Sequence, residues 1–574
     1  MKRSTLILLV LTLAGGLFLR TYQLSERGLL VADEAGYFSA SASAAIHARW
    51  WLGGKGKGLP ADAQREKLIE TLEKAGAHRG LVHQSKPLYG LLVILVFTLF
   101  GLSPQFLFLM NATLGAATVG IMFWLALRLG RTESGALLSA LALAVSGFHL
   151  IWSRSGFSQA SATFFLVLGL ACYAQAVWGG REASRRWLAA SGLGLGAGFA
   201  MHPVVGFYVG VCFLVEGYRS VRDGRIRHGL ANLLMIGLGF GVVLSLMQLL
   251  TWSAGRLLLP DYSWIYGDTI PTYLQGLLNS KWKVMESGWV VDTPRAKLSG
   301  YVLMPFLYGE GAVISGLALV GFGLMVVRFA RDGWSPRSFF LLAAFGLPLL
   351  LFATVRVKPF PRNIGPLAPV VALLAGVSLE SLWARLGRGG RRWAAVGLFL
   401  LIQYVHMAYL FDIRSGFASA KTWLNRKGGK HVVFLRPNSD GSLLYSNGFR
   451  DVYHAKWART GEVLEVVKMS SWKRAEFPPK PNTKSYAGVI GGSRIGGGPL
   501  NQAWVSRFDF SRPVASFPNP RAFTLKKIEL LRGIQWLIKR TGSQWMAVWV
   551  KNELGGENRV MVSGTIHLYR MRTP

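Results

Sequence analysis

The sequence predicts an α-helical polytopic membrane protein that continues into a soluble α/β domain. The chain has 574 residues, is 51% apolar, and contains several stretches without charge over the roughly 20 residues that a membrane-spanning helix needs. From Asp412 onward, these stretches give way to one helical segment and several short β-rich runs. The only cysteines, Cys172 and Cys212, lie within apolar runs, so the sequence offers neither a disulfide framework nor a zinc site.

About eleven apolar segments are predicted to cross the membrane. The first follows Lys2-Arg3, and we interpret it as a retained span because no small-residue cleavage site precedes Arg20. We read His202-Pro203 as a break between two short spans; one long kinked helix is the alternative. The other ten segments lie near 105–127, 135–152, 159–178, 187–201, 203–217, 229–250, 310–327, 338–354, 363–384 and 393–411.

The charges of the short loops predict the orientation. Sixteen Arg and four acids occur in the linkers 128–134, 179–187, 217–228, 328–337 and 385–392, whereas the links 151–159, 200–204 and 355–362 hold four basic residues. Arg-rich short loops stay in the cytoplasm, so the N-terminus is expected inside and the C-terminus outside. If the apolar stretch 86–101 crossed the membrane, every later Arg-rich loop would lie outside. This stretch is therefore expected to lie in the membrane interface or to re-enter the membrane on the same side.

This orientation predicts an integral protein of the cytoplasmic (inner) membrane with two domains. Residues 1–411 form the transmembrane domain, whose exterior loop 22–87 carries interfacial helices. Residues 412–574 form a soluble exterior (periplasmic) α/β domain with 27 basic and 10 acidic residues, a net charge of +17. Such a domain would be attracted to anionic headgroups or to an anionic acceptor, although a merely solvated basic surface is the alternative. We place no active site in it.

Two adjacent carboxylates stand out in "VADEAGYFSA", just beyond the first span. Asp33 and Glu34 are expected near the headgroup layer, on the exterior side. A carboxylate there can act as a general base or bind a divalent cation. The alternative is an N-terminal cap for the helix that follows, and both roles can coexist.

The other polar features of the exterior face are cationic. Arg offers a planar fork that fits phosphate oxygens, and Lys offers a compact charge. Each residue alone could equally be a snorkelling side chain at the interface. Together with the carboxylate pair they suit a site that handles a phosphorylated lipid, and the candidates are Lys86, Arg154, Arg356, Lys358 and Arg362.

These motifs, in this order over residues 1–411, resemble the GT-C glycosyltransferases. The nearest groups are the family 39 protein O-mannosyltransferases and the lipid A aminoarabinose transferases. The resemblance is carried by the "DE" after the first span and by "SKPLYG", "HLIWSRSGFSQASATFF" and "KPFPRNIGPLAPVVALLAG". It implies a GT-C fold and transfer of a sugar from a polyprenyl-phosphate donor to a lipid, protein or glycan acceptor on the outer side of the membrane.

The resemblance also implies roles for individual residues. The catalytic base of these families maps onto Asp33, with Glu34 as its neighbour. The Lys-Pro that contacts the donor phosphate maps onto Lys86, and the Ser-Arg and late-span arginines map onto Arg154 and Arg362.

Two departures bear on a metal. Ser85 and Gln159 replace acids of the relatives, which leaves few carboxylate oxygens for Mg²⁺ or Mn²⁺. We therefore assign no metal or other cofactor, and a divalent cation has little support.

The mechanism expected from these residues is an inverting transfer. Asp33 takes the proton of an acceptor hydroxyl as that oxygen attacks the anomeric carbon. The leaving phosphate needs cations more than a proton, and Lys86, Arg356, Lys358 and Arg362 are the candidates.

Other functions fit the sequence less well. A lipid or glycan transporter or flippase usually needs ionisable residues deep in its spans, and these spans are nearly free of charge away from their ends. A membrane-anchored module that binds anionic polymer leaves the carboxylates without a role. Nucleic acid is not expected as a partner because the basic domain is predicted outside the cytoplasm.

Overall fold

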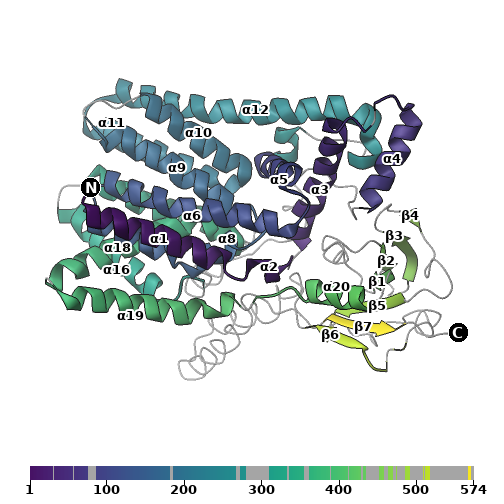
Figure 1. The fold of residues 1–574 in the computed structure, drawn as a ribbon. Helices are drawn as coiled ribbons and strands as arrows, with labels where there is room; N and C mark the ends of the chain where they lie inside the picture. Colours follow the sequence, from purple (N-terminus) through teal and green to yellow (C-terminus); the bar gives the residue numbers. More distant parts are fainter. Residues whose placement is uncertain are drawn as a thin grey trace.

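The structure is a computed structural model in which long helices run side by side, with a mixed β-sheet beyond one end of them (Figure 1). It describes the chain except residues 30–31, 56, 75–85, 181–184, 267–271, 279–308, 332–334, 355–360, 388, 412, 428–430, 435–450, 458–462, 469–472, 475–484, 491–508, 510, 518–565 and 571–574. All structural statements below concern the described residues.

The first half of the chain is helical. Its elements are α1 (Arg3–Thr21), α2 (Leu24–Arg27), α3 (Ala32–Leu52), α4 (Ala61–Lys74), α5 (Pro87–Phe100), α6 (Pro104–Arg128), α7 (Glu133–Ala144), α8 (Gly147–Ser153), α9 (Gln159–Trp178), α10 (Arg185–Met201), η1 (Pro203–Val205), α11 (Gly206–Arg222) and α12 (Ile226–Tyr266). Local sequence explains several of the starts. Ser103 caps α6 by accepting a hydrogen bond from the amide of Gln105, and Thr132 caps α7 by accepting one from Gly135.

The later helices complete the bundle and lead to the sheet. They are α16 (Ala312–Arg331), α17 (Pro336–Thr354), η3 (Pro361–Leu367), α18 (Ala368–Arg385), α19 (Gly390–Met407), η4 (Ala408–Leu410) and α20 (Gly416–Arg426).

Seven described helices are long and apolar enough to cross a membrane. They are Arg3–Arg27, Pro104–Arg128, Gln159–Trp178, Pro203–Arg222, Ile226–Leu259, Ala312–Arg331 and Ile364–Arg385. The pair α7 and α8, bent by 57°, would be an eighth if it forms one span. An exposed apolar stripe along α12, formed by Leu230, Leu234, Leu238, Val242 and Leu246, is typical of a surface that faces lipid. The chain is an integral membrane protein.

The predicted spans can now be compared with the helices. Helices occupy all eleven predicted segments, but α10, α17 and α19 fall short of the length and apolarity of a membrane span. The number of eleven crossings therefore stays a prediction. The chain does break at His202-Pro203, since α10 ends at Met201 and α11 begins at Gly206.

The extent of α12 differs from the prediction. We expected the span to end near residue 250 and a loop to follow, but the helix continues to Tyr266. The helix is regular from residue 226 to residue 261, about 54 Å and nearly twice the thickness of a bilayer core, and it kinks at Tyr262 before its last residues. The extra turns are held by apolar contacts, because Leu258 and Leu259 pack against a cluster that contains Ile46, Trp50 and Leu68 of α3 and α4.

Helices α3 and α5 lie at the end of the bundle near the sheet (Figure 1). Figure 1 shows α3 running across the long helices, with α5 beside it. The 14 residues of α5 span only about 21 Å, which is shorter than a bilayer core. This length is compatible with the interfacial or re-entrant position predicted for the stretch 86–101.

The described strands of the C-terminal part form one seven-stranded sheet. Its order is β4-β3-β2-β1-β5-β7-β6. The central strand β1 pairs in parallel with β2 and β5, and the other pairs are antiparallel. The strands are β1 (His431–Phe434), β2 (Asp451–Trp457), β3 (Val463–Lys468), β4 (Lys473–Arg474), β5 (Ser485–Ile490), β6 (Ala515–Phe517) and β7 (Ile566–Arg570).

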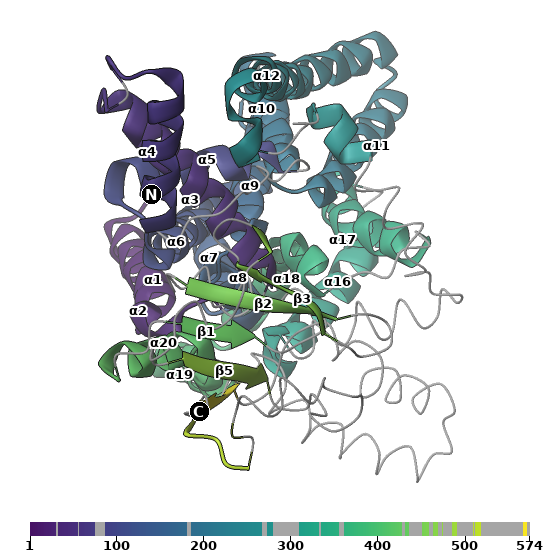
Figure 2. The same cartoon turned by 90° about the vertical axis from the view of Figure 1, so that its right-hand side faces the viewer.

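The sheet lies over the end of the bundle where α2 and α3 are found (Figures 1 and 2). One continuous apolar core reaches from the long helices through Ile413 and Leu424 to Leu568 of β7. The division of the chain at residue 411 into a membrane domain and a soluble exterior α/β domain stays a prediction.

Candidate functional site

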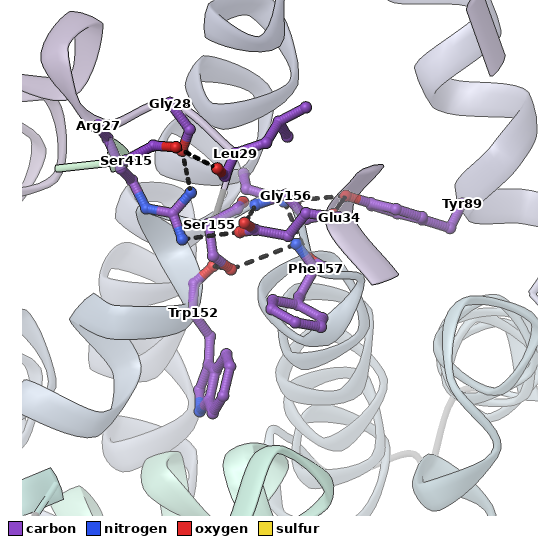
Figure 3. Close-up of polar contacts among 11 residues, drawn as sticks. Arg27, Gly28, Leu29, Glu34, Tyr89, Trp152, Ser155, Gly156, Phe157 and Ser415 are labelled. Carbon is purple, nitrogen blue, oxygen red and sulfur yellow. Dashed lines mark hydrogen bonds and ion pairs between the residues drawn. The ribbon is translucent and has the colours of Figure 1, made fainter. Parts of the chain in front are cut away.

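Glu34 lies at the centre of a buried polar cluster between the start of α3 and the loop that joins α8 to α9 (Figure 3). Its side chain is 0% exposed. The Oε1 atom accepts a hydrogen bond from Nη2 of Arg27 at 2.7 Å and another from the backbone amide of Gly156 at 2.8 Å. A buried carboxylate is stable in its charged form only when it is paired and hydrogen-bonded in this way.

Arg27 supplies the compensating charge. It comes from the short helix α2 and is 7% exposed. Its guanidinium lies 4.7 Å from the centroid of the Phe108 ring and donates through Nη1 to the backbone oxygen of Gly28 at 3.1 Å. The aromatic face and the hydrogen bonds together fix the position of the Arg27 side chain.

The loop between α8 and α9 is held by Asn111, a buried residue in the middle of α6. Its Nδ2 atom lies 2.7 Å from the backbone oxygen of Ser155 and 2.8 Å from that of Phe157. Tyr89 of α5 donates through its hydroxyl to the backbone oxygen of Gly156 at 2.6 Å. These contacts fix the amide of Gly156, which is the one that binds Glu34.

Lys86 lies at the start of α5 and belongs to the same neighbourhood. Its ammonium donates to the hydroxyl of Tyr37 and lies 5.0 Å from the centroid of the Tyr37 ring. The Tyr37 ring packs edge-on against Tyr89, with centroids 5.1 Å apart. Through Tyr37, Tyr89 and Gly156, a chain of contacts connects Lys86 with Glu34, two residues that the sequence predicts for one site.

Arg154 is buried and contacts the end of α1. It is 3% exposed, and its Nη1 atom donates to the backbone oxygens of Leu19 at 2.9 Å and Tyr22 at 2.8 Å. Its guanidinium lies 5.0 Å from the centroid of the Phe411 ring. Burial, with a smaller effect from the charge of Arg27, lowers the pKa of Arg154 to about 10. These contacts hold the end of α1, and a role in phosphate binding stays a prediction.

The remaining predicted site residues are not fully described. Asp33 lies in the first turn of α3, and Arg362 lies in η3, but both side chains are outside the described part of the chain. Arg356 and Lys358 lie outside the described residues altogether.

Three residues of the cluster were missed from the sequence. Arg27 is one of several charges in the first loop and Tyr89 belongs to an apolar stretch, so the sequence singles out neither. Asn111 did carry a signal, because an amide in the middle of an apolar segment needs partners inside the protein.

Among the described residues, no group of three His, Cys, Asp or Glu side chains is arranged to hold a metal ion.

The chain resembles several solved structures in fold. The structure of ArnT from Cupriavidus metallidurans bound to undecaprenyl phosphate superimposes with a TM-score of 0.53 at 12% identity, covering 89% of this chain and 96% of that chain. The apo oligosaccharyltransferase of Archaeoglobus fulgidus gives a TM-score of 0.52 at 11% identity, covering 100% and 89%. The archaeal oligosaccharyltransferase AglB from the same organism, in complex with an inhibitory peptide and a dolichol-phosphate, gives 0.52 at 11% identity, covering 99% and 88%. This is the GT-C glycosyltransferase fold.

A sequence profile agrees with this class. The profile described as dolichyl-phosphate-mannose-protein mannosyltransferase matches residues 80–221, which include Lys86, Tyr89, Asn111 and Gly156. The expected resemblance to GT-C enzymes of the protein O-mannosyltransferase and aminoarabinose transferase kind is confirmed. No curated protein matches the chain significantly in sequence.

Proposed function

We propose that the protein is a glycosyltransferase that moves a sugar from a polyprenyl-phosphate donor to an acceptor at the outer face of the membrane. The observation that carries this proposal is the meeting of three separate segments at one end of the bundle. The start of α3 brings Glu34, the start of α5 brings Lys86, and the loop after α8 brings Gly156. These segments carry three of the four motifs on which the resemblance rests.

The orientation of the site supports the outer face. Glu216 and Glu380 pair with Arg219 and Arg131 in the Arg-rich loops predicted to be cytoplasmic. Gly156 lies in the loop between α8 and α9. The Arg-rich linker 128–134 precedes α7 and α8, and the Arg-rich linker 179–187 follows α9, so the Gly156 loop lies at the opposite ends of these helices. Arg-rich short loops remain inside, so the cluster around Glu34 belongs on the exterior side, where a lipid-linked sugar of the outer leaflet would present its headgroup.

The donor class is supported by the neighbours in fold. One of them was solved with undecaprenyl phosphate and another with a dolichol-phosphate. A phosphate group fits a site with a lysine, because an ammonium stabilises the charge on phosphate oxygens. Lys86 is the described residue to which we assign this role, and Arg356, Lys358 and Arg362 remain further candidates.

The reaction we propose is a direct displacement at the anomeric carbon. The acceptor oxygen forms a bond to that carbon as the bond from the carbon to the phosphate oxygen breaks, so the configuration inverts. Asp33 receives the proton of the acceptor hydroxyl, and the departing polyprenyl phosphate keeps the electron pair. Lys86 stabilises the charge that grows on the leaving phosphate.

Glu34 has a different task from Asp33 in this proposal. Its oxygen is already engaged by Arg27 and Gly156. We therefore assign to Glu34 the positioning of the first turn of α3, and to the preceding residue, Asp33, the proton transfer.

The test is sugar turnover by purified protein in vesicles supplied with labelled polyprenyl-phosphate sugars and candidate acceptors. We expect turnover by the wild type and a loss of ~10²–10⁴-fold in Asp33→Asn, the usual cost of removing a positioned base. The thermal unfolding midpoint of the variant should match that of the wild type. Near-normal turnover in Asp33→Asn contradicts the assignment of the base. Absence of turnover with every donor, from folded wild-type protein, contradicts the proposed function and favours transport.

A further inference from the structure

The C-terminal part of the chain touches the loop that supports Glu34. Ser415, the residue before α20, is 1% exposed. Its backbone amide donates to the backbone oxygen of Arg27 at 2.6 Å. Its hydroxyl donates to the backbone oxygen of Leu29, also at 2.6 Å, across 386 positions of sequence (Figure 3). One serine thus binds the loop on both sides of Gly28.

The position of Gly28 requires a glycine. Its φ of +64° is a conformation that favours glycine. A Cβ atom at this position would lie 2.7 Å from Cβ of Ser415 and 3.0 Å from Cβ of Ala418. Both the backbone conformation and the close approach of α20 therefore exclude a larger residue.

The contact continues directly to the buried carboxylate. Ser415 holds the backbone of Arg27, and the side chain of Arg27 pairs with Glu34 at 2.7 Å. A second link beside it, the ion pair of Arg414 with Glu26 at 2.7 Å, is exposed and adds little. The chain of contacts runs from α20 through Ser415 and Arg27 to Glu34.

The same helix is joined to the sheet. Ala420 and Leu424 of α20 are buried in the core that includes Leu568 of β7. The ring of Trp423 packs against Phe517 of β6, with centroids 6.3 Å apart. Strands β6 and β7 are thus connected to the loop before α3 through one packed helix.

We propose that Ser415 is a positioning residue for the active-site loop. Through it, the sheet-bearing C-terminal part holds Arg27 and Glu34 in place and so belongs to the catalytic unit, rather than being an independent binding module. This inference deepens the proposed function and rests on it for its catalytic consequence. The physical contact itself can be tested without activity.

The primary test is amide hydrogen exchange of the full-length protein in lipid nanodiscs, followed in peptides that cover residues 24–37. Loss of one buried hydrogen bond in Ser415→Ala should raise exchange in these peptides roughly fivefold. Gly28→Ala tests the same contact from the other side and should have a larger effect. The matched control is Ser419→Ala, because the Ser419 hydroxyl reaches only the backbone oxygen of Ser415, at 3.5 Å. Unchanged exchange in both Ser415→Ala and Gly28→Ala overturns the proposal.

The catalytic consequence is tested by kinetics on the same preparations. If Ser415 positions the loop, kcat falls in Ser415→Ala while KM for the donor stays the same, and Ser419→Ala behaves as wild type. A normal kcat in Ser415→Ala, with wild-type turnover established, overturns the positioning role. Failure of the proposed function is distinguishable, because the wild type would then show no turnover while the exchange experiment still reports on the contact.

Discussion

Glu34 and Glu216 are both fully buried and both accept a hydrogen bond from an arginine, yet they lie in very different surroundings. Glu216 of α11 is 1% exposed. Its carboxylate accepts hydrogen bonds from Tyr173 at 2.8 Å, from Arg219 at 2.6 Å and from Asn232 at 3.0 Å. These partners belong to α9, α11 and α12, so the cluster fastens three long helices together.

The partners of Glu34 are held by loops and short elements. Arg27 sits in a four-residue helix, next to a glycine with positive φ, and Gly156 lies in the turn between α8 and α9. Lys86 and the backbone of Asp33 are nearby. Burial and ion pairing of a carboxylate therefore do not by themselves indicate a site. The difference is that the Glu34 cluster fixes loops next to the proposed catalytic residues, whereas the Glu216 cluster fixes helices.

The largest expected effect is on the free energy of unfolding. Removing the charge of either buried glutamate should lower it by a similar amount. Glu34→Gln and Glu216→Gln each leave an arginine without its buried countercharge, which costs about 3–5 kcal/mol. Thermal or denaturant unfolding in detergent measures this loss. Glu133→Gln is the control, because Glu133 is an acid at the surface end of α7 and should have little effect. A stability loss confined to one of the two buried sites would break the parallel.

Donor binding tests the role of Lys86. Lys86→Gln removes the ammonium next to Tyr37 and Tyr89, and we expect the affinity for a polyprenyl phosphate to fall by about 10–100-fold, the range of one charge-assisted hydrogen bond. Binding of undecaprenyl phosphate to protein in nanodiscs measures this change. Lys57→Gln, at an exposed position after α3, is the matched control. Equal affinities for the two variants would remove Lys86 from the site.

A smaller effect concerns pH and a third buried acid. Glu310, just before α16, is 0% exposed. Burial raises its pKa from 4.5 to about 8, against smaller opposing effects of Ser146 and the amide of Phe148. The carboxyl is thus neutral in the folded protein at a pH where the unfolded chain would have lost the proton. Its stabilising contribution is complete below pH 4.5 and is lost as the pH rises through about 8.

The measurement is the unfolding midpoint between pH 5 and pH 8. The wild type should lose stability over this range relative to Glu310→Gln, whose amide does not titrate. Parallel pH profiles of the two proteins would show that Glu310 ionises normally in the fold.

Much of the helical architecture was predictable from apolar segments, because a stretch of about 20 uncharged residues has few other uses. The end of α12 was not, since its extra turns depend on packing against α3 and α4. Among the site residues, contacts through Tyr37, Tyr89 and Gly156 connect Lys86 with Glu34, and the roles of both residues stay predictions. Arg154 was expected on the donor phosphate, but its described contacts are with the end of α1.

The partners of Glu34 could not be predicted for a physical reason. Arg27 is buried between Glu34 and the ring of Phe108, and Ser415, far away in the sequence, binds the loop on both sides of Gly28. Such contacts depend on the path of the chain in three dimensions, which the spacing of residues along one sequence does not reveal.

The most direct test of the central claim is the turnover per folded molecule of Glu34→Gln and Glu216→Gln, measured in the same vesicles with a labelled polyprenyl-phosphate sugar. The folded fraction of each preparation is determined in parallel, so that stability and activity are separated. If the Glu34 cluster builds the active site, Glu34→Gln loses turnover per folded molecule while Glu216→Gln keeps the wild-type value. Equal specific activities for the two variants would contradict the account and reduce Glu34 to a structural acid like Glu216.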